Sequence, residues 1–314
     1  MNRRLFALPA AVAVVTVGLA ACSSGVDSAG ASASSSAAPA GGAEIKVVAS
    51  TNVWGDLAAS IGGDKVQVTS IITSPDADPH EYEANTRNQL SLAEASVVIE
   101  NGGGYDDFID RMLKSSKNSS ATVLNAVTIS GKQATGGEEL NEHVWYDFPT
   151  VEKVVDQLAK AYSEADPAAA STFQQNAAAL KQKIDGLEQQ EATLKQKYDG
   201  QPVAITEPVP VYLLDAIGLQ NKTPDEFSEA IEEDSDVPAK VLNETLQLYS
   251  EHQVKVLAYN SQTTGPETEK ILNAAKQNNI PAVPVTETLP AGKDYVGWMS
   301  ANLDALGTAL GRQS

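Results

Sequence analysis

Residues 168–198 carry the most regular hydrophobic pattern in the sequence. Apolar side chains recur there in alternating steps of four and three, interrupted once by Glu191; they are Phe173, Ala177, Leu180, Ile184, Leu187, Leu194 and Tyr198. This period predicts a single helix of about 30 residues, roughly 45 Å long at 1.5 Å per residue. A coiled-coil dimer is the alternative, but the stripe is short and its flanking positions are not systematically charged. We therefore expect a monomer in which this rigid helix spans two domains.

Short strand patterns alternate with helical patterns on both sides of this helix. The predicted strands are residues 45–49, 66–72, 97–100 and 122–124 before it, and 203–205, 254–259 and 282–285 after it. Such alternation is typical of parallel sheets with helical crossovers, and 314 residues suffice for about two domains. We predict an α/β fold of two lobes, residues 44–165 and 200–314, joined by the long helix over 168–198. Each lobe would hold a mainly parallel sheet flanked by helices.

The first 21 residues have the features of a signal peptide. A basic segment, residues 2–4, precedes an apolar stretch over residues 5–19. This stretch of about 15 residues is too short for a transmembrane helix and has the flanks of a secretory leader. We expect residues 1–21 to be removed and the remaining chain to lie outside the cytoplasm.

The single cysteine follows this leader directly. Leu19-Ala20-Ala21-Cys22 resembles the lipobox of bacterial lipoproteins, in which the cysteine becomes the acylated first residue. An ordinary signal-peptidase site followed by an unrelated cysteine is the alternative. Residues 22–43 are rich in Ser, Ala and Gly, the composition of a flexible tether. We expect Cys22 to anchor the protein to the bacterial membrane through lipid.

The charge balance is strongly acidic. The chain has 22 Lys and Arg against 41 Asp and Glu, a net charge of −19. Loss of Arg3 and Arg4 with the leader gives 20 − 41 = −21. Nucleic acids and anionic membranes are polyanions, so neither is expected as a partner of the folded part.

Two of the three histidines lie beside carboxylates in loops. His80 occurs in Asp-Pro-His-Glu-Tyr-Glu, residues 78–83, and His143 in Glu-His-Val-Trp-Tyr-Asp, residues 142–147. Imidazole and carboxylate are typical ligands of divalent first-row metals, although one such histidine alone is more often a solvated surface residue. His252 follows a predicted helix and is interpreted as a helix-end charge or a packing residue.

Two residues of the second lobe follow strands in a comparable way. Glu207 follows the strand over 203–205 after one intervening residue, and Asn260 comes directly after the strand over 254–259. Ligands of open α/β sheets bind outside the carboxyl ends of the strands. Pro208 is predicted to lie in the first turn of the next helix, which would put Glu207 at the helix cap.

The order of these motifs resembles a known family. A lipobox, the two histidine loops, a long helix and Thr206-Glu207-Pro208-Val209 follow one another as in the substrate-binding lipoproteins of zinc and manganese ABC importers, the cluster A-I type. The resemblance covers residues 45–310. It implies two α/β lobes on a rigid helix, a divalent cation bound between them, and delivery of that cation to an ABC permease without catalysis.

The resemblance also implies a set of ligands. His80 and His143 match the two histidines of the first lobe, and Glu207 matches a position that is His in zinc-type members and Glu in many manganese-type members. The family usually has an Asp after the second strand of the second lobe, where this chain has Asn260 and no carboxylate before Glu267. Asn260 is the tentative fourth ligand, with a Thr hydroxyl or water as alternatives.

The residues leave two questions open. Two imidazoles favour zinc, whereas a bidentate Glu favours manganese. We expect the cation to be Mn²⁺ or Zn²⁺; the resemblance makes manganese the preferred metal, and iron is third.

The second question is whether the protein is an enzyme. An open three-ligand site also suits a metal-dependent hydrolase with Glu81 or Glu142 as the general base. The sequence has no His-Glu-x-x-His motif, so we expect a binding protein rather than an enzyme.

Overall fold

The structure is a computed structural model that describes residues 44–74, 82, 85–134 and 140–312. The predicted signal peptide, Cys22, the tether and His80 lie outside the described residues. Among the residues it describes, no helix combines the length and the apolar composition needed to cross a membrane.

The first half of the described chain contains a four-stranded parallel sheet in the order β2-β1-β3-β4. Its strands are β1 (Ile45–Thr51), β2 (Val66–Ile72), β3 (Val97–Glu100) and β4 (Thr122–Asn125). Its helices are α1 (Asn52–Gly62), α2 (Thr86–Glu94), α3 (Phe108–Ser116), α4 (Ala126–Ser130) and α5 (Phe148–Ala165), with short 3₁₀ turns at Gly63–Lys65 and Val144–Tyr146. β3 is buried along its whole length, as expected for a parallel strand covered on both faces.

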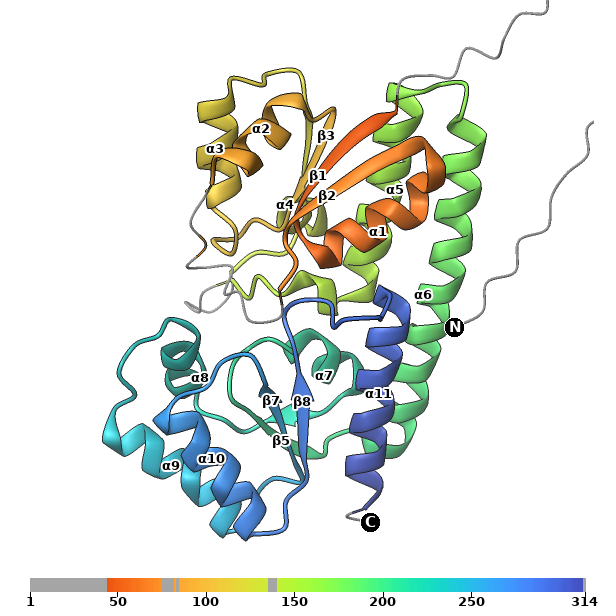
Figure 1. The fold of residues 1–314 in the computed structure, drawn as a ribbon. Helices are drawn as coiled ribbons and strands as arrows, with labels where there is room; N and C mark the ends of the chain where they lie inside the picture. Colours follow the sequence, from red (N-terminus) through yellow and green to blue (C-terminus); the bar gives the residue numbers. More distant parts are fainter. Residues whose placement is uncertain (1–43, 75–81, 83–84, 135–139, 313–314) are drawn as a thin grey trace, which may run out of the picture. The chain divides into compact units, whose positions relative to one another are not determined.

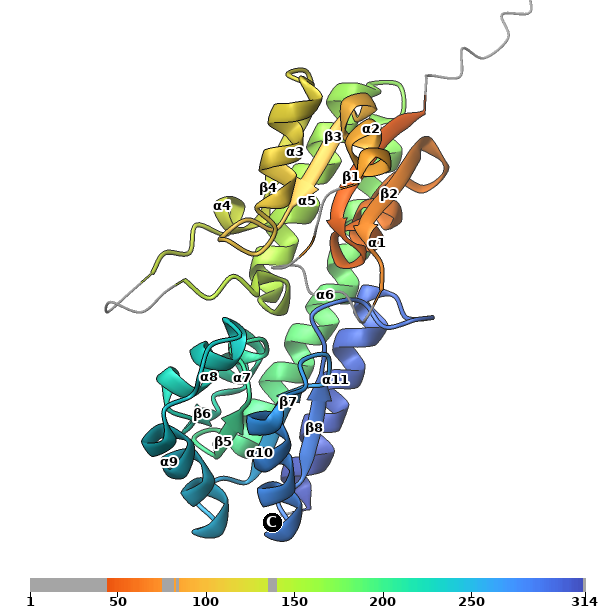
Figure 2. The same ribbon diagram turned by 60° about the vertical axis from the view of Figure 1, so that its left-hand side comes forward.

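The second half repeats this arrangement in the order β6-β5-β7-β8, again with every pairing parallel. Its strands are β5 (Pro202–Ile205), β6 (Gln220–Asn221), β7 (Val256–Asn260) and β8 (Ala282–Val285). Its helices are α7 (Val211–Ile217), α8 (Asp225–Glu232), α9 (Ala239–Ser250), α10 (Pro266–Gln277) and α11 (Tyr295–Gly311). The predicted α/β fold with two parallel sheets is confirmed (Figures 1 and 2).

The predicted long helix is α6 (Ala170–Tyr198). It packs against α1 and α5 of the first half and against α7 and α11 of the second (Figures 1 and 2). The apolar stripe read from the sequence is its packing face, with Phe173 and Ile184 fully buried. Glu191 lies on the same face and is buried too, which raises the pKa of its carboxyl to about 8 because the charged form is poorly solvated.

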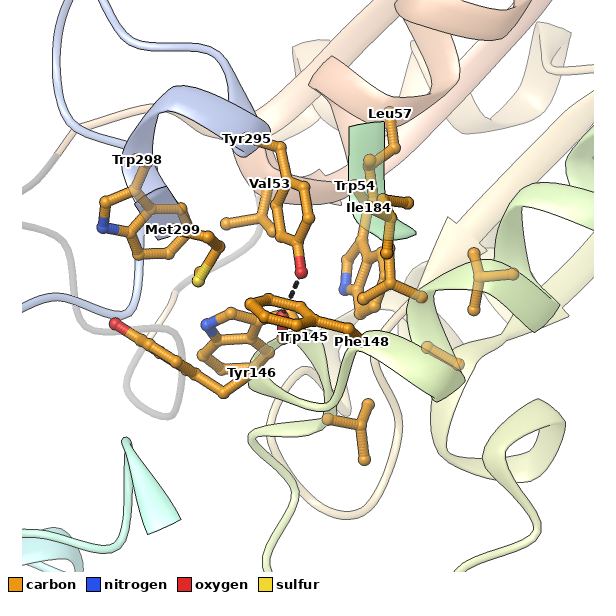
Figure 3. Close-up of a cluster of buried hydrophobic side chains, with 14 of the residues drawn as sticks. Val53, Trp54, Leu57, Trp145, Tyr146, Phe148, Ile184, Tyr295, Trp298 and Met299 are labelled. Carbon is orange, nitrogen blue, oxygen red and sulfur yellow. Dashed lines mark hydrogen bonds between the residues drawn. The ribbon is translucent and has the colours of Figure 1, made fainter. Parts of the chain in front are cut away.

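Aromatic side chains join the two halves near the middle of α6 (Figure 3). Trp54 of α1, Trp145 and Tyr146 meet Tyr295 and Trp298 of α11 in one buried cluster. The Tyr295 hydroxyl donates a hydrogen bond of 2.6 Å to the Trp145 carbonyl. Burying one large apolar side chain contributes about 2 kcal/mol, so this cluster holds α11 firmly against the first half.

The start of α7 differs from the prediction. Pro208 was expected in its first turn, but α7 begins at Val211 and residues 206–210 form turns. The reason is Pro210, whose ring disfavours the helical conformation at Val209. Glu207 therefore lies in an irregular segment after β5 and does not cap the helix.

Candidate metal centre

His143 is completely buried in the segment that leads into α5. Its ring lies edge-on to Trp145, with ring centroids 5.0 Å apart, and to Tyr105 at 6.0 Å. Its Nδ1 atom lies 2.8 Å from the side-chain oxygen of Asn141, and its backbone N–H donates to the same oxygen at 3.0 Å. The imidazole is thus held on one side by aromatic rings and on the other by a short loop.

Asn141 determines which ring nitrogen is available to a ligand. Its amide nitrogen donates to the carbonyl of Pro208 at 3.0 Å, so its oxygen is the atom that faces the imidazole. An oxygen can only accept, so Nδ1 of His143 carries the proton. A ring that binds a cation would therefore do so through Nε2, after loss of the proton there, and this kind of second contact orients metal-ligating histidines.

The same loop joins the two halves of the protein. Besides the bond to Pro208, the backbone carbonyl of Asn141 accepts a hydrogen bond of 2.6 Å from the Tyr212 hydroxyl of α7. His143 is consequently fixed relative to the residue that follows Glu207. In the first half, Asn101 supports this loop by donating to the carbonyl of Glu142 at 2.9 Å.

The carboxyl ends of β5, β7 and β8 bring three polar side chains together. Glu207 follows β5, Asn260 ends β7, and Glu287 lies two residues after β8; all three are buried. The Asn260 amide nitrogen donates to Glu207 at 2.5 Å and to Glu287 at 2.7 Å. β5 and β7 are also the neighbours at which the strand order reverses, the position where open α/β sheets bind ligands.

Asn260 holds these carboxylates through its nitrogen. That nitrogen also lies 3.1 Å from the Thr263 hydroxyl, so three acceptors share its two hydrogens. Its oxygen accepts the backbone N–H of Gln262 at 3.0 Å. Asn260 as a metal ligand stays a prediction, and these hydrogen bonds indicate a different role, which is to position Glu207 and Glu287.

Glu232, the last residue of α8, completes the group. Its Oε1 atom lies 3.2 Å from Nε2 of His143, and its side chain is 10% exposed. Possible ligand atoms of Glu142, His143 and Glu232 all lie within 4.8 Å of one another. Glu287 interacts electrostatically with both His143 and Tyr105 of the first half, so carboxylates of the second half surround the imidazole.

Burial and charge shift both titrating residues of the centre in the same direction. Burial lowers the pKa of His143, but the carboxylates of Glu232, Glu142 and Glu287 together outweigh it, and the pKa is about 10. Burial, followed by the charge of Glu232, raises the pKa of Glu207 to about 8, although the Asn260 amide opposes this. Buried negative groups that repel one another are stabilised by a cation.

One atom from each half is notable for its hydrogen bonding. Within the described part of the chain, neither Nε2 of His143 nor Oε1 of Glu207 has a hydrogen-bond partner of acceptable geometry. Buried polar atoms are nearly always satisfied, so these two are available for another ligand. Imidazole nitrogen and carboxylate oxygens together suit a divalent first-row metal.

The structure thus places His143, Glu207 and Asn260 in one region, while His80 lies outside the described residues. The sequence prediction missed Glu232 and Glu287. Glu287 follows a predicted strand, so the rule that led to Glu207 and Asn260 also applies to it. Glu232 lies in α8, a helix that was not predicted although Phe227, Ala230 and Ile231 have helical spacing.

Two parallel sheets on one long helix, with a buried imidazole–carboxylate centre, define a substrate-binding protein for a metal cation. A family model described as "Zinc-uptake complex component A periplasmic" matches residues 47–309, and the chain belongs to this family. The family consists of solute-binding proteins of ABC metal importers rather than enzymes, which confirms the predicted binding function over the hydrolase alternative.

Individual relatives agree with this assignment. The chain is 27% identical over 277 residues to the manganese-binding lipoprotein MntA of Bacillus subtilis, covering 86% of this chain and 85% of the relative. It resembles the periplasmic zinc-binding protein TroA of Treponema pallidum with a TM-score of 0.72 and 19% identity, covering 84% and 98% of the two chains. It also resembles the P. aeruginosa protein FpvC, whose structure is a complex with Ni²⁺. There the TM-score is 0.70 and the identity 21%, covering 86% of this chain and 98% of the other. These two likenesses concern the fold.

Proposed function

We propose that this protein binds one divalent cation through His80, His143, Glu207 and Glu287, with Asn260 positioning the two carboxylates. The observation that carries the proposal is the pair of buried atoms without hydrogen bonds, Nε2 of His143 and Oε1 of Glu207. Each has the chemistry of a metal ligand. They belong to opposite halves, and the hydrogen bond from Asn141 to Pro208 links the segments that carry them.

The cargo we propose is Mn²⁺ or Zn²⁺, with manganese preferred. The B. subtilis relative is named for manganese and the T. pallidum protein for zinc, so the fold accommodates more than one metal. Glu207 and Glu287 supply hard oxygen donors, and carboxylates suit manganese better than the nitrogen-rich or sulfur-rich sets that favour zinc.

Location and delivery complete the proposal. Relatives are named as lipoproteins of metal ABC transporters, which supports an extracytoplasmic, membrane-anchored protein that hands its cation to a permease. In this chain, Cys22 would carry the lipid, residues 22–43 would be the tether, and the protein would act as a monomer. Replacing Cys22 by Ala should move the protein from the membrane fraction to the soluble fraction; unchanged membrane retention would contradict this anchor.

Metal analysis tests the binding function directly. The full chain purified without added metal should contain about one equivalent of manganese or zinc. After chelation it should bind either ion again in a competition titration, and Glu207→Ala should weaken both. No stoichiometric metal, together with no binding of either ion by the stripped protein, would overturn the proposal.

A further inference from the structure

Glu232 occupies a position that the proposed four-ligand site does not explain. It is the final residue of α8, and its side chain is nine-tenths buried while Glu233, the next residue, is exposed. The negative end of a helix dipole disfavours a carboxylate there. Glu232 also lies close enough to Glu207 for the two like charges to interact. A cation bound beside Glu232 would offset these unfavourable neighbours.

The imidazole of His143 lies beside Glu232, at ion-pair distance. Nε2 of His143 and Oε1 of Glu232 are 3.2 Å apart. The distance fits another arrangement. Two ligands that each lie about 2.1 Å from one first-row cation are separated by roughly 3.0–3.5 Å at coordination angles of about 90–110°. Nε2 and Oε1 therefore have the spacing of two neighbouring ligands.

The orientation of the ring supports the same arrangement. Asn141 engages Nδ1, which leaves Nε2, the atom beside Glu232, as the ring nitrogen available to a cation. Glu142, His143 and Glu232 form a group of possible ligand atoms within 4.8 Å. A cation on Nε2 would consequently lie within reach of the Glu232 carboxylate.

We propose that Glu232 is a direct ligand of the bound cation and determines its preference for manganese over zinc. This inference rests on the metal-binding function proposed above. A carboxylate beyond Glu207 and Glu287 raises the number of oxygen donors and takes the shell past four ligands. Mn²⁺ accepts such a shell, whereas Zn²⁺ prefers four tetrahedral ligands and gains less from it.

The test compares Glu232→Gln with Glu233→Gln in the full chain after metal removal. Both variants lose one negative charge at adjacent positions, but only the first changes the proposed ligand. Competition titration should show Mn²⁺ affinity about tenfold lower in Glu232→Gln, and Zn²⁺ affinity lower by about threefold or less. Glu233→Gln should bind both ions like the wild type. X-ray absorption at the manganese edge should show one fewer oxygen neighbour in Glu232→Gln.

Three results would overturn the inference. Equal affinities in the two variants would show that Glu232 contributes no more than surface charge. Tighter Mn²⁺ binding in Glu232→Gln would show that the carboxylate competes with the cation for His143. Equal losses for manganese and zinc would refute its role in metal preference. In each of these cases wild-type binding would persist; failure of the wild type to bind either ion would instead refute the proposed function itself.

Discussion

The two sheets have the same strand order but use their carboxyl ends differently. At the ends of β3 and β4 the polar groups pair with one another: Asn125 donates to Glu100 at 2.9 Å, and Asp106 accepts the backbone N–H groups of Asn101 and Gly102. At the ends of β5, β7 and β8 the polar side chains instead gather toward His143. The first sheet thus supports a loop that carries a ligand, whereas the second sheet presents ligands from its own strand ends.

This difference shows what each half of the site depends on. His143 is positioned by loop hydrogen bonds, chiefly those of Asn141, and by aromatic packing. Glu207 and Glu287 share a hydrogen-bond donor, the side-chain amide of Asn260. Substitutions in the two halves should therefore differ in the size and kind of their effects.

The largest effect is expected at the imidazole. His143→Ala removes the one described nitrogen ligand, and we expect affinity for both Mn²⁺ and Zn²⁺ to fall about hundredfold in a competition titration. His252→Ala is the matched control because His252 is exposed and follows α9. Wild-type affinity in His143→Ala, with an unchanged circular dichroism spectrum, would show that His143 is not a ligand.

A smaller and selective effect is expected at Glu207. Glu207→His replaces an oxygen ligand by a nitrogen ligand, so the ratio of zinc to manganese affinity should rise about tenfold. Calorimetric titration with each ion measures this ratio, and Glu269→His, at an exposed position of α10, serves as the control. An unchanged ratio would mean that Glu207 does not contact the cation.

The positioning amides should matter less than the ligands. Asn141→Ala and Asn260→Ala remove contacts that orient ligands, and each should weaken binding by about tenfold at most. The comparison between the halves predicts an additional difference. Asn141→Ala should impair both metals equally because it affects the imidazole, whereas Asn260→Ala should impair manganese more because it loosens two carboxylates. The opposite order would contradict the assignment of roles.

The smallest effect is a pH dependence of stability in the metal-free protein. Glu207, with a pKa of about 8, and His143, with a pKa of about 10, both bind protons more tightly in the folded chain than in the unfolded one. Their contributions are present at low pH and are lost as pH rises, over about pH 4.5–8 for Glu207 and about 6.5–10 for His143. The melting temperature should therefore fall by a few degrees from pH 5 to pH 8.

Metal should remove part of this fall, because a cation stabilises the ionised Glu207. Glu191 has a similar pKa but lies in α6, so its contribution should persist with metal bound. Glu207→Gln should flatten the metal-free profile, and Glu191→Gln should flatten both profiles. A melting temperature that rises from pH 5 to pH 8 without metal would contradict the account.

The parts of the fold that follow from local patterns were predictable. The spacing of Phe173, Ile184 and Leu187 was sufficient to predict α6, and runs of buried residues such as Val97-Val98-Ile99 gave the parallel strands. The start of α7 was misplaced because two prolines, Pro208 and Pro210, both suit a helical first turn, and only the steric effect on Val209 decides between them. Local sequence is a weaker guide where two such signals compete.

The site was predictable only in part. His143 and Glu207 stood out by residue type and by position after a loop or strand. Glu287 also follows the carboxyl end of a strand, but the resemblance pointed to the residue after β7 as the fourth ligand. No local signal in the sequence shows that Asn260 and Glu287, which are 27 positions apart, share a hydrogen bond. Glu232 belongs to α8, and no residue adjacent to it in the sequence belongs to the site. Its proximity to His143 is a property of tertiary packing alone.

The central claim is that one cation joins His143 of the first half to Glu207 and Glu287 of the second. Anomalous diffraction from crystals of the manganese-loaded protein, recorded at the manganese edge, tests it most directly. The account predicts a single strong peak about 2.0–2.3 Å from Nε2 of His143 and from carboxylate oxygens of Glu207 and Glu287. A peak bound to residues of one half only, or bound away from His143, would contradict it.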